Sequence, residues 1–80
     1  MRLVSSGELG RRLRAARKQA GSRQADFASR LQVSQSTVCG WERGQFRPSS
    51  DLWAAVAAAC GSTVADLFFD RDEPSAAANS

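Results

Sequence analysis

Apolar residues recur along the chain at the spacing of an α-helix. In residues 6–19, Leu9, Leu13 and Ala16 are four and then three positions apart, which places them on one face of a helix whose other faces carry arginine. No segment alternates convincingly between apolar and polar residues as a strand does. The pattern therefore predicts an all-α fold with four more helices, over residues 23–31, 35–43, 50–60 and 64–69.

Small polar residues and glycines mark where these helices begin and end. Ser34 is in position to cap the third helix, and Thr63 with Asp66 three residues later resembles a capping box. Gly21, Gly44 and Gly61 follow the first, third and fourth helices, where glycine is favoured. The helical pattern predicts one domain over residues 6–70, preceded by a flexible N-terminus (residues 1–5) and followed by a disordered tail (residues 71–80).

The charges are distributed unevenly. Residues 1–47 hold ten basic and three acidic residues, a net charge of +7, whereas residues 48–80 hold one basic and five acidic residues, a net charge of −4. A basic half of this kind is typical of a nucleic-acid-binding face. The alternative is that these charges only solvate helix surfaces.

The residues present exclude several function classes. The chain has no histidine and two cysteines, Cys39 and Cys60, without metal-ligand spacing, so we expect no enzyme, no metal and no cofactor. Neither a signal peptide nor an apolar run of about 20 residues is present, so we expect a cytoplasmic protein that does not enter a membrane. Cys39 is interpreted as a small residue that fits a DNA groove, with a redox sensor as the alternative.

Residues 24–44 predict a pair of short helices separated by about three residues. Two such helices pack at about 90–120° and leave the second one protruding. The outer face of this second helix carries small or uncharged polar side chains, among them Gln35, Ser36 and Thr37. A helix with such a face can enter the major groove of B-DNA.

This segment and its surroundings resemble the Cro/cI-type, or XRE-type, helix-turn-helix regulators, which have a compact five-helix fold like that of the lambda repressor. The resemblance extends from about Leu9 to Phe68. The matching residues are Arg17, Gly21, Gln24, Phe27-Ala28, Leu31, Val33-Ser34, Thr37-Val38, Trp41-Glu42-Arg43-Gly44, Pro48-Ser49, Val56-Ala57, Gly61 and Leu67-Phe68.

The resemblance implies roles for individual residues. Gln24 would bind a backbone phosphate and brace Gln35, and Gln35 would read adenine in the major groove. Arg17 and Glu42 would form an ion pair between the first and third helices. The expected DNA contacts are Arg23, Gln24, Gln35, Ser36, Thr37, Gly40, Arg43, Gln45 and Arg47.

Three positions depart from the family pattern. Gln32 stands in the turn where the family usually has glycine, which costs about 1 kcal/mol if the backbone there has a positive φ. Arg23 replaces the usual Ser or Thr cap of the second helix, unless Ser22 substitutes for it. Gly40 stands where relatives often carry a base-reading side chain.

The sequence thus predicts a sequence-specific regulator that binds double-stranded DNA, as a repressor or autoregulator. A homodimer on DNA is expected, with Leu67, Phe68 and Phe69 as its interface; alternatively, these residues only close the core. Two other hypotheses remain open. The chain is an antitoxin or accessory protein whose main contact is a protein partner, or it binds nucleic acid without sequence preference.

Overall fold

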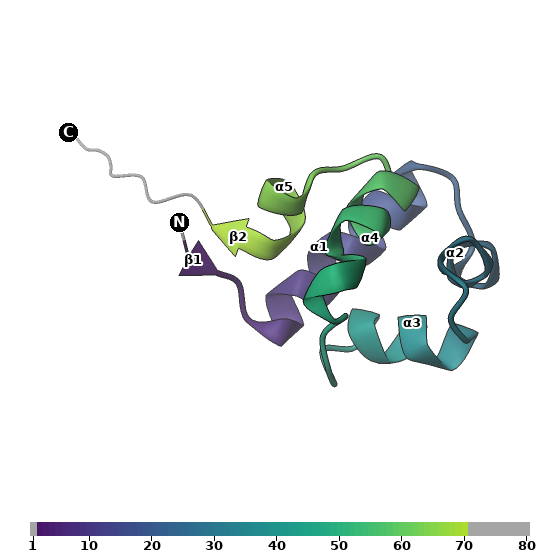
Figure 1. Ribbon diagram of the computed structural model, residues 1–80, viewed down its shortest axis with the longest axis horizontal. Coiled ribbons are helices and arrows are strands. Elements are labelled where there is room, and N and C mark those ends of the chain that lie inside the picture. Colours follow the sequence, from purple (N-terminus) through teal and green to yellow (C-terminus); the bar gives the residue numbers. More distant parts are fainter. Residues whose placement is uncertain (1, 71–80) are drawn as a thin grey trace.

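The computed structural model describes residues 2–70, and these fold around a set of short helices (Figure 1). The predicted all-α fold is confirmed, with a 3₁₀ turn and one very small sheet added to it. The elements are β1 (Arg2–Leu3), α1 (Ser6–Gln19), α2 (Gln24–Leu31), α3 (Gln35–Glu42), η1 (Ser50–Leu52), α4 (Trp53–Ala59), α5 (Val64–Phe68) and β2 (Phe69–Asp70). The tail predicted for residues 71–80 lies outside the described residues.

Side-chain caps begin three of the helices. The hydroxyls of Ser34 and Thr63 accept the backbone N–H three residues later, at 3.1 and 3.0 Å, as the sequence predicted. Ser5 caps α1 in the same way, at 3.1 Å to the N–H of Glu8. At the start of α2, Arg23 occupies the cap position without a capping side-chain bond, and the Ser22 hydroxyl donates to the Arg23 carbonyl instead. The predicted loss of a cap at α2 is therefore confirmed.

The turn between α2 and α3 contains a strained residue. Gln32 has φ 58° and ψ 41°, and it is the one non-glycine residue with a positive φ among residues 2–70. Its N–H donates to the carbonyls at the end of α2, as a C-terminal cap does. The left-handed backbone conformation for which the family usually has glycine is thus present. A glutamine in this conformation destabilises the fold, because its Cβ crowds the backbone.

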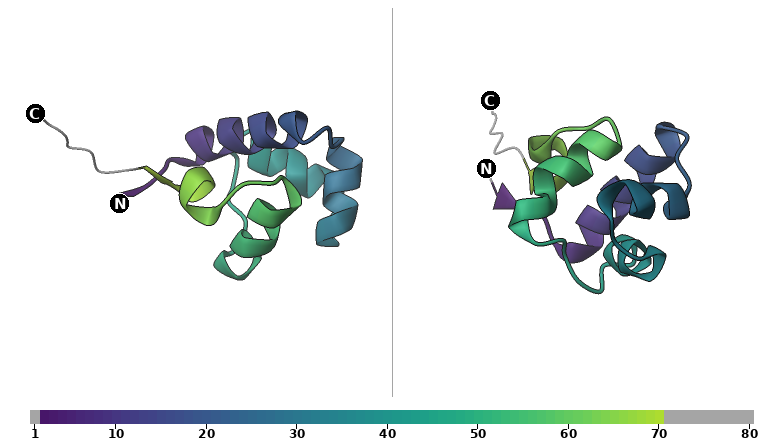
Figure 2. Two further views of the ribbon diagram at one scale, coloured as in Figure 1. Left: turned by 90° about the horizontal axis from the view of Figure 1, so that it is seen from above. Right: turned by 45° about the vertical axis from the view of Figure 1, so that its right-hand side comes forward.

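The core lies between α1 and the other helices. Leu9 and Leu13 of α1 are fully buried, and α3 packs against both α1 and α2 (Figures 1 and 2). Trp41 is a core residue, as predicted, while Trp53 is half-buried. Every remaining α-helix contributes at least one fully buried side chain, and Val4 joins them from the segment before α1. The helical ones are Phe27, Val38, Val56, Leu67 and Phe68. Among residues 2–70, no helix is both long and apolar enough to cross a membrane.

Residues 2–4 are ordered by a contact between the two ends of the domain. β1 pairs antiparallel with β2, Val4 donates its N–H to the Phe68 carbonyl at 2.9 Å, and the Val4 side chain is 2% exposed. The prediction of a flexible segment is therefore wrong for these residues, as is the expectation of no strand. A two-residue strand is too short to show an alternating pattern, and its partner lies at the far end of the sequence.

Arg12 of α1 stabilises this contact between β1 and β2, which we call the clasp. Its guanidinium donates to the carbonyls of Asp66 and Phe69, at 3.1 Å each, and to the Asp70 carboxylate at 2.5 Å. Its Nε donates to Glu8 at 2.9 Å, and hydrogen bonds from Arg12 and Arg11 lower the pKa of Glu8. One arginine thereby joins the middle of α1 to the C-terminal strand.

Candidate nucleic-acid interface

α2 and α3 form the predicted helix-turn-helix, with Gln32, Val33 and Ser34 as the turn between them. Val38 and Trp41 anchor α3 to the core, at 0% and 2% exposure. The side of α3 opposite these anchors faces outward. Gln35 and Ser36 on α3 are exposed, as is Arg43, which directly follows the helix. α3 is thus the helix whose exposed polar side could contact the major groove of DNA.

Gln24 and Gln35 are in contact on this outward side. Nε2 of Gln35 donates to Oε1 of Gln24 at 3.4 Å, and Nε2 of Gln24 donates to Oε1 of Glu42 at 3.0 Å. The first residue of α2 therefore braces the first residue of α3, as the family resemblance implied. Both amides belong to one chain of hydrogen bonds that starts inside the protein.

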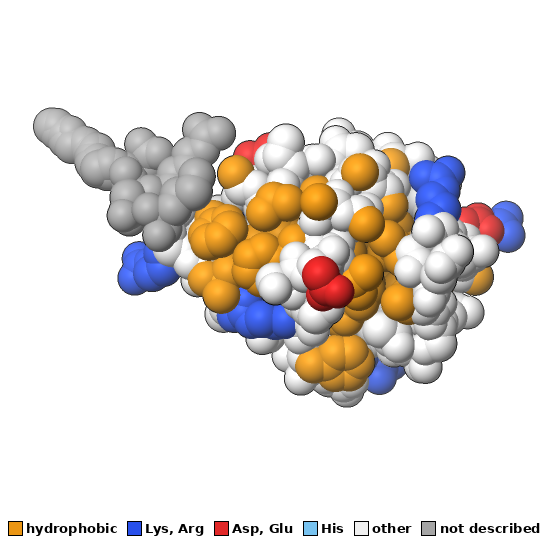
Figure 3. Space-filling model, in the orientation of Figure 1, with side chains coloured by type: hydrophobic (Ala, Val, Ile, Leu, Met, Phe, Trp, Pro, Cys, Tyr) orange, Lys and Arg blue, Asp and Glu red, His pale blue; other side chains and the backbone are white. Residues whose placement is uncertain are grey.

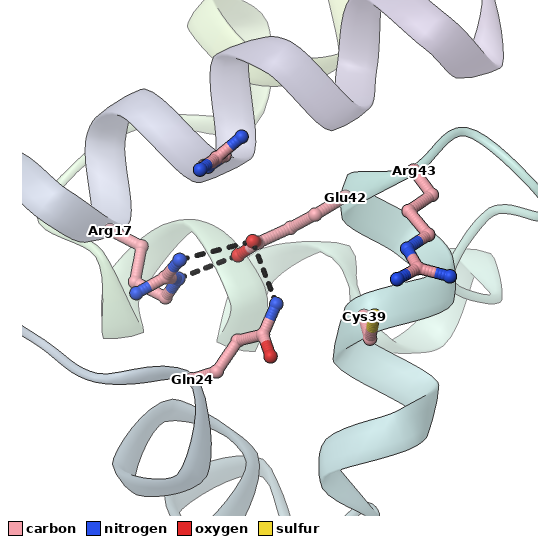
Figure 4. A pocket seen from close by; sticks show the side chains of 6 residues that line it. Arg17, Gln24, Cys39, Glu42 and Arg43 are labelled. Atoms are coloured by element: carbon pink, nitrogen blue, oxygen red, sulfur yellow. Dashed lines mark hydrogen bonds and ion pairs between the residues drawn. The ribbon is translucent and has the colours of Figure 1, made fainter.

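That chain starts at the ion pair between Arg17 and Glu42, which is present as predicted. Nε and Nη2 of Arg17 donate to the two carboxylate oxygens of Glu42 at 2.6 and 3.0 Å (Figure 4). The two side chains are only 9% and 4% exposed, and Nη1 of Arg17 donates to the Ser22 carbonyl at 2.8 Å. The hydrogen bond to Glu42 raises the pKa of Arg17, so the guanidinium keeps its charge.

A hollow beside the ion pair opens between α1 and α3, and its mouth is basic. Cys39 and Arg43 from the α3 side face the same space as Gln24 (Figure 4). Arg14 of α1 also lines it, although it is not among the residues that the sequence predicted for the site. The sequence feature that could have identified Arg14 is its position one helical turn before Arg17. The lining residues are Arg14, Arg17, Gln24, Cys39, Glu42 and Arg43.

A second hollow adjoins the first along the outer side of α3. Its lining includes Gln35, Ser36 and Gln45, three of the predicted DNA contacts. Around the two hollows, Arg14, Arg23 and Arg43 are exposed and make no ion pair with any residue that the structure describes. Their guanidinium groups are therefore available to an anionic partner such as a phosphate backbone.

Two predicted DNA contacts are placed differently from the expectation. Gly40 is buried, because the ring of Phe46 lies directly over it. Arg47 is half-buried and turned toward the N-terminal segment, where its Nη2 donates to the Val4 carbonyl at 2.6 Å. Arg47 therefore holds the loop after α3 to the start of the chain, and its phosphate contact stays a prediction. Thr37 is half-buried, with its hydroxyl 2.8 Å from that of Ser34.

Two of the three residues predicted for a dimer interface belong to the core. Leu67 and Phe68 are 2% and 0% exposed, so they have no surface for a partner, and the alternative that they close the core is correct for them. Trp53 stacks on Phe68 with ring centroids 4.5 Å apart and meets Phe69 edge to face at 6.0 Å. Of the three, only Phe69 keeps exposed surface. Hydrophobic side chains gather on the face of the molecule that carries α4 and α5 (Figure 3).

Comparison with known proteins agrees with this architecture. A family model described as a helix-turn-helix domain matches residues 8–67. The crystal structure of the clp gene regulator ClgR from Corynebacterium glutamicum is 35% identical, with a TM-score of 0.73; the match covers 78% of this chain and 66% of ClgR, slightly less than two thirds of its length. A search of curated protein sequences gives no match.

Two further structures show where else this fold occurs. The restriction-modification controller protein C.AhdI from Aeromonas hydrophila is 32% identical, with a TM-score of 0.72, and the match covers 79% of this chain and 96% of C.AhdI. Hydroxypropylphosphonic acid epoxidase from S. wedmorenis is 25% identical, with a TM-score of 0.74, but the match covers 80% of this chain and only 34% of the epoxidase. The chain therefore belongs to the helix-turn-helix domain family, in its XRE-type (Cro/cI-type) group of DNA-binding regulators.

Proposed function

We propose that this chain is a sequence-specific regulator that binds double-stranded DNA by placing α3 in the major groove. The observation that carries the proposal is the hydrogen-bonded pair of Gln24 and Gln35 on the outward side of the helix-turn-helix. A glutamine amide presents a donor and an acceptor side by side, which matches N7 and N6 of adenine. Because Gln24 restrains Gln35, less side-chain entropy is lost when the base is bound.

The cations around α3 supply the affinity that does not depend on sequence. Arg23 lies before α2 and Arg43 caps the end of α3, so the two are positioned to contact phosphates on either side of the groove. Arg14 of α1 lies beside the basic hollow, in reach of the same backbone. Phosphate contacts of this kind fix the register of the protein, while base contacts specify the sequence.

Two chains are expected to bind one operator. Adjacent half-sites on one face of B-DNA lie about 34 Å apart, so a pair of α3 helices at that spacing reads a palindrome. Leu67 and Phe68 contribute nothing to such a pair because they are buried. The regulator would then repress transcription by occupying its site.

The proposal also treats the chain as a protein without enzymatic activity. This part rests on the exposed polar side of α3 and the cations around it, since the epoxidase comparison shows that the fold also occurs within an enzyme.

The experiment is a selection of bound duplexes from a random pool at about 150 mM salt, where nonspecific binding is weakened. The wild type is compared with Gln35→Ala and with Gln19→Ala, which removes an exposed glutamine at the end of α1. We expect a palindromic motif that Gln19→Ala preserves and that Gln35→Ala blurs at one position in each half-site. Failure to enrich any motif would contradict the proposal and favour a protein partner as the main contact.

A salt titration on the selected duplex tests the phosphate contacts separately. Arg43→Gln should weaken binding about equally for all sequences and lower the slope of log K against log salt by about 1. Arg30→Gln is the matched control, because Arg30 is exposed on α2 but donates to the Ala59 carbonyl of α4. An unchanged slope in Arg43→Gln would remove this residue from the interface.

A further inference from the structure

The loop after α3 places an aromatic ring, that of Phe46, on the outward side of α3. Phe46 is 48% exposed, and only one other large apolar residue among residues 2–70 is exposed, Leu3 at 42%. Single exposed apolar side chains are common and need no explanation by themselves. The position of this one relative to Gly40 gives it a meaning.

The Phe46 ring occupies the space into which a side chain at position 40 would project. A Cβ built on Gly40 would lie 2.4 Å from Cζ and 2.6 Å from Cε2 of the ring, far inside van der Waals contact. Gly40 follows Ser36 by one helical turn and lines the same outer hollow as Gln35 and Gln45. The missing side chain of α3 is therefore replaced, in space, by a ring from the loop.

We propose that Phe46 is a specificity-determining residue that contacts the 5-methyl group of a thymine in the major groove. This inference rests on the proposed function. A thymine methyl is the one apolar group that a base edge presents in the major groove, and phenylalanine is among the side chains suited to it. The ring lies over Gly40, and the hollow that Gly40 lines also includes Ser36, Arg43 and Gln45. These three are polar or cationic and exposed, which suits a nucleic acid rather than an apolar protein surface.

The geometry also assigns a role to Gly40. Because only the far end of the Phe46 ring would meet a new Cβ, Gly40→Ala should fold normally but push the ring aside. Glycine at this position thus positions the ring, although Gly40 itself makes no base contact. This gives two independent ways to disturb the same contact, one by removing the ring and one by moving it.

The test replaces each thymine of the selected duplex in turn with deoxyuridine, which lacks only the methyl group. Binding is measured by fluorescence anisotropy. For the wild type we expect one position per half-site at which the substitution raises Kd about fourfold, the effect of one buried methyl group at about 0.8 kcal/mol. Phe46→Ala should bind both duplexes equally at that position. Phe46→Leu, which keeps an apolar side chain, should retain part of the difference.

Two controls separate this contact from general effects. Leu3→Ala removes the other exposed apolar side chain, on β1 outside the candidate interface, and should discriminate as the wild type does. Gly40→Ala should lose the discrimination, and adding it to Phe46→Ala should change nothing further. Circular dichroism melting confirms that each variant is folded.

The outcomes distinguish this inference from the proposed function. If the wild type selects a motif but tolerates deoxyuridine everywhere, or if Phe46→Ala still discriminates, the thymine contact is overturned while DNA reading by α3 stands. If no duplex is bound in preference to random DNA, both are overturned.

Discussion

Replacing Arg17 with leucine should remove about half of the stability of the domain. Glu42 would lose the hydrogen bonds from Nε and Nη2 of Arg17, at 2.6 and 3.0 Å, and keep only the one from Gln24, at 3.0 Å. The Glu42 side chain is 4% exposed, so water replaces the lost donors poorly. A buried charge deprived of its partner costs about 3–5 kcal/mol. A domain of this size is stable by roughly 4–12 kcal/mol in total.

Urea denaturation, followed by far-UV circular dichroism, measures this loss. The matched control is Arg11→Leu, because Arg11 also pairs with a glutamate but is 74% exposed, and Glu8 keeps its second partner. An exposed pair contributes less than about 1 kcal/mol. The double variant Arg17→Leu/Glu42→Leu should recover most of the loss, since it leaves no unpaired charge. The reasoning is refuted if Arg17→Leu costs no more than Arg11→Leu, or if the double variant is as unstable as the two single losses added together.

Three further predictions concern other parts of the fold. Gln32→Gly should raise the free energy of unfolding by up to about 1 kcal/mol in urea titration, because the φ of 58° favours glycine; no gain would mean that the turn carries no strain. Burial raises the pKa of the Cys60 thiol, so its contribution to stability is complete below the unfolded-state pKa of about 8.5 and is lost as pH rises toward the folded value. The wild type should therefore lose more stability than Cys60→Ala between about pH 8 and pH 10, and parallel curves would contradict this. Arg12→Gln should cost about 1–2 kcal/mol and speed hydrogen exchange at the Val4 amide, which bonds to Phe68; unchanged exchange there would show that Arg12 does not hold the clasp.

The parts of the fold that the sequence predicted are those with a local signature. Helical periodicity and capping residues located α1 and α3 within a residue or two, because one buried face and a few orphan N–H groups determine them. The family resemblance identified Arg17 with Glu42 and the strained position of Gln32. Each of these depends on residue types at fixed spacing.

The parts that the sequence did not predict are contacts to backbone groups or to glycine. Arg47 and one nitrogen of Arg12 donate to backbone carbonyl oxygens, which every residue possesses, so no sequence pattern distinguishes these acceptors. The sequence predicts a DNA contact for Arg47 and no individual role for Arg12. The packing of Phe46 on Gly40 is equally hidden, because a glycine shows no complementary side chain. Such contacts require the backbone path, which periodicity does not supply.

The hydrogen bond that Glu42 accepts from Gln24 explains why a charged pair, and not an apolar one, lies between α1 and α3. Apolar residues of similar volume would often stabilise a fold as well or better. The carboxylate, however, also accepts from Nε2 of Gln24, and this fixes which way the Gln24 amide points. A flipped amide would set its oxygen against the carboxylate, so Oε1 of Gln24 must face Gln35 and accept from it. The buried pair thereby determines which atoms of the outward amides remain free. Under the proposed function, stability and base reading would then depend on the same carboxylate.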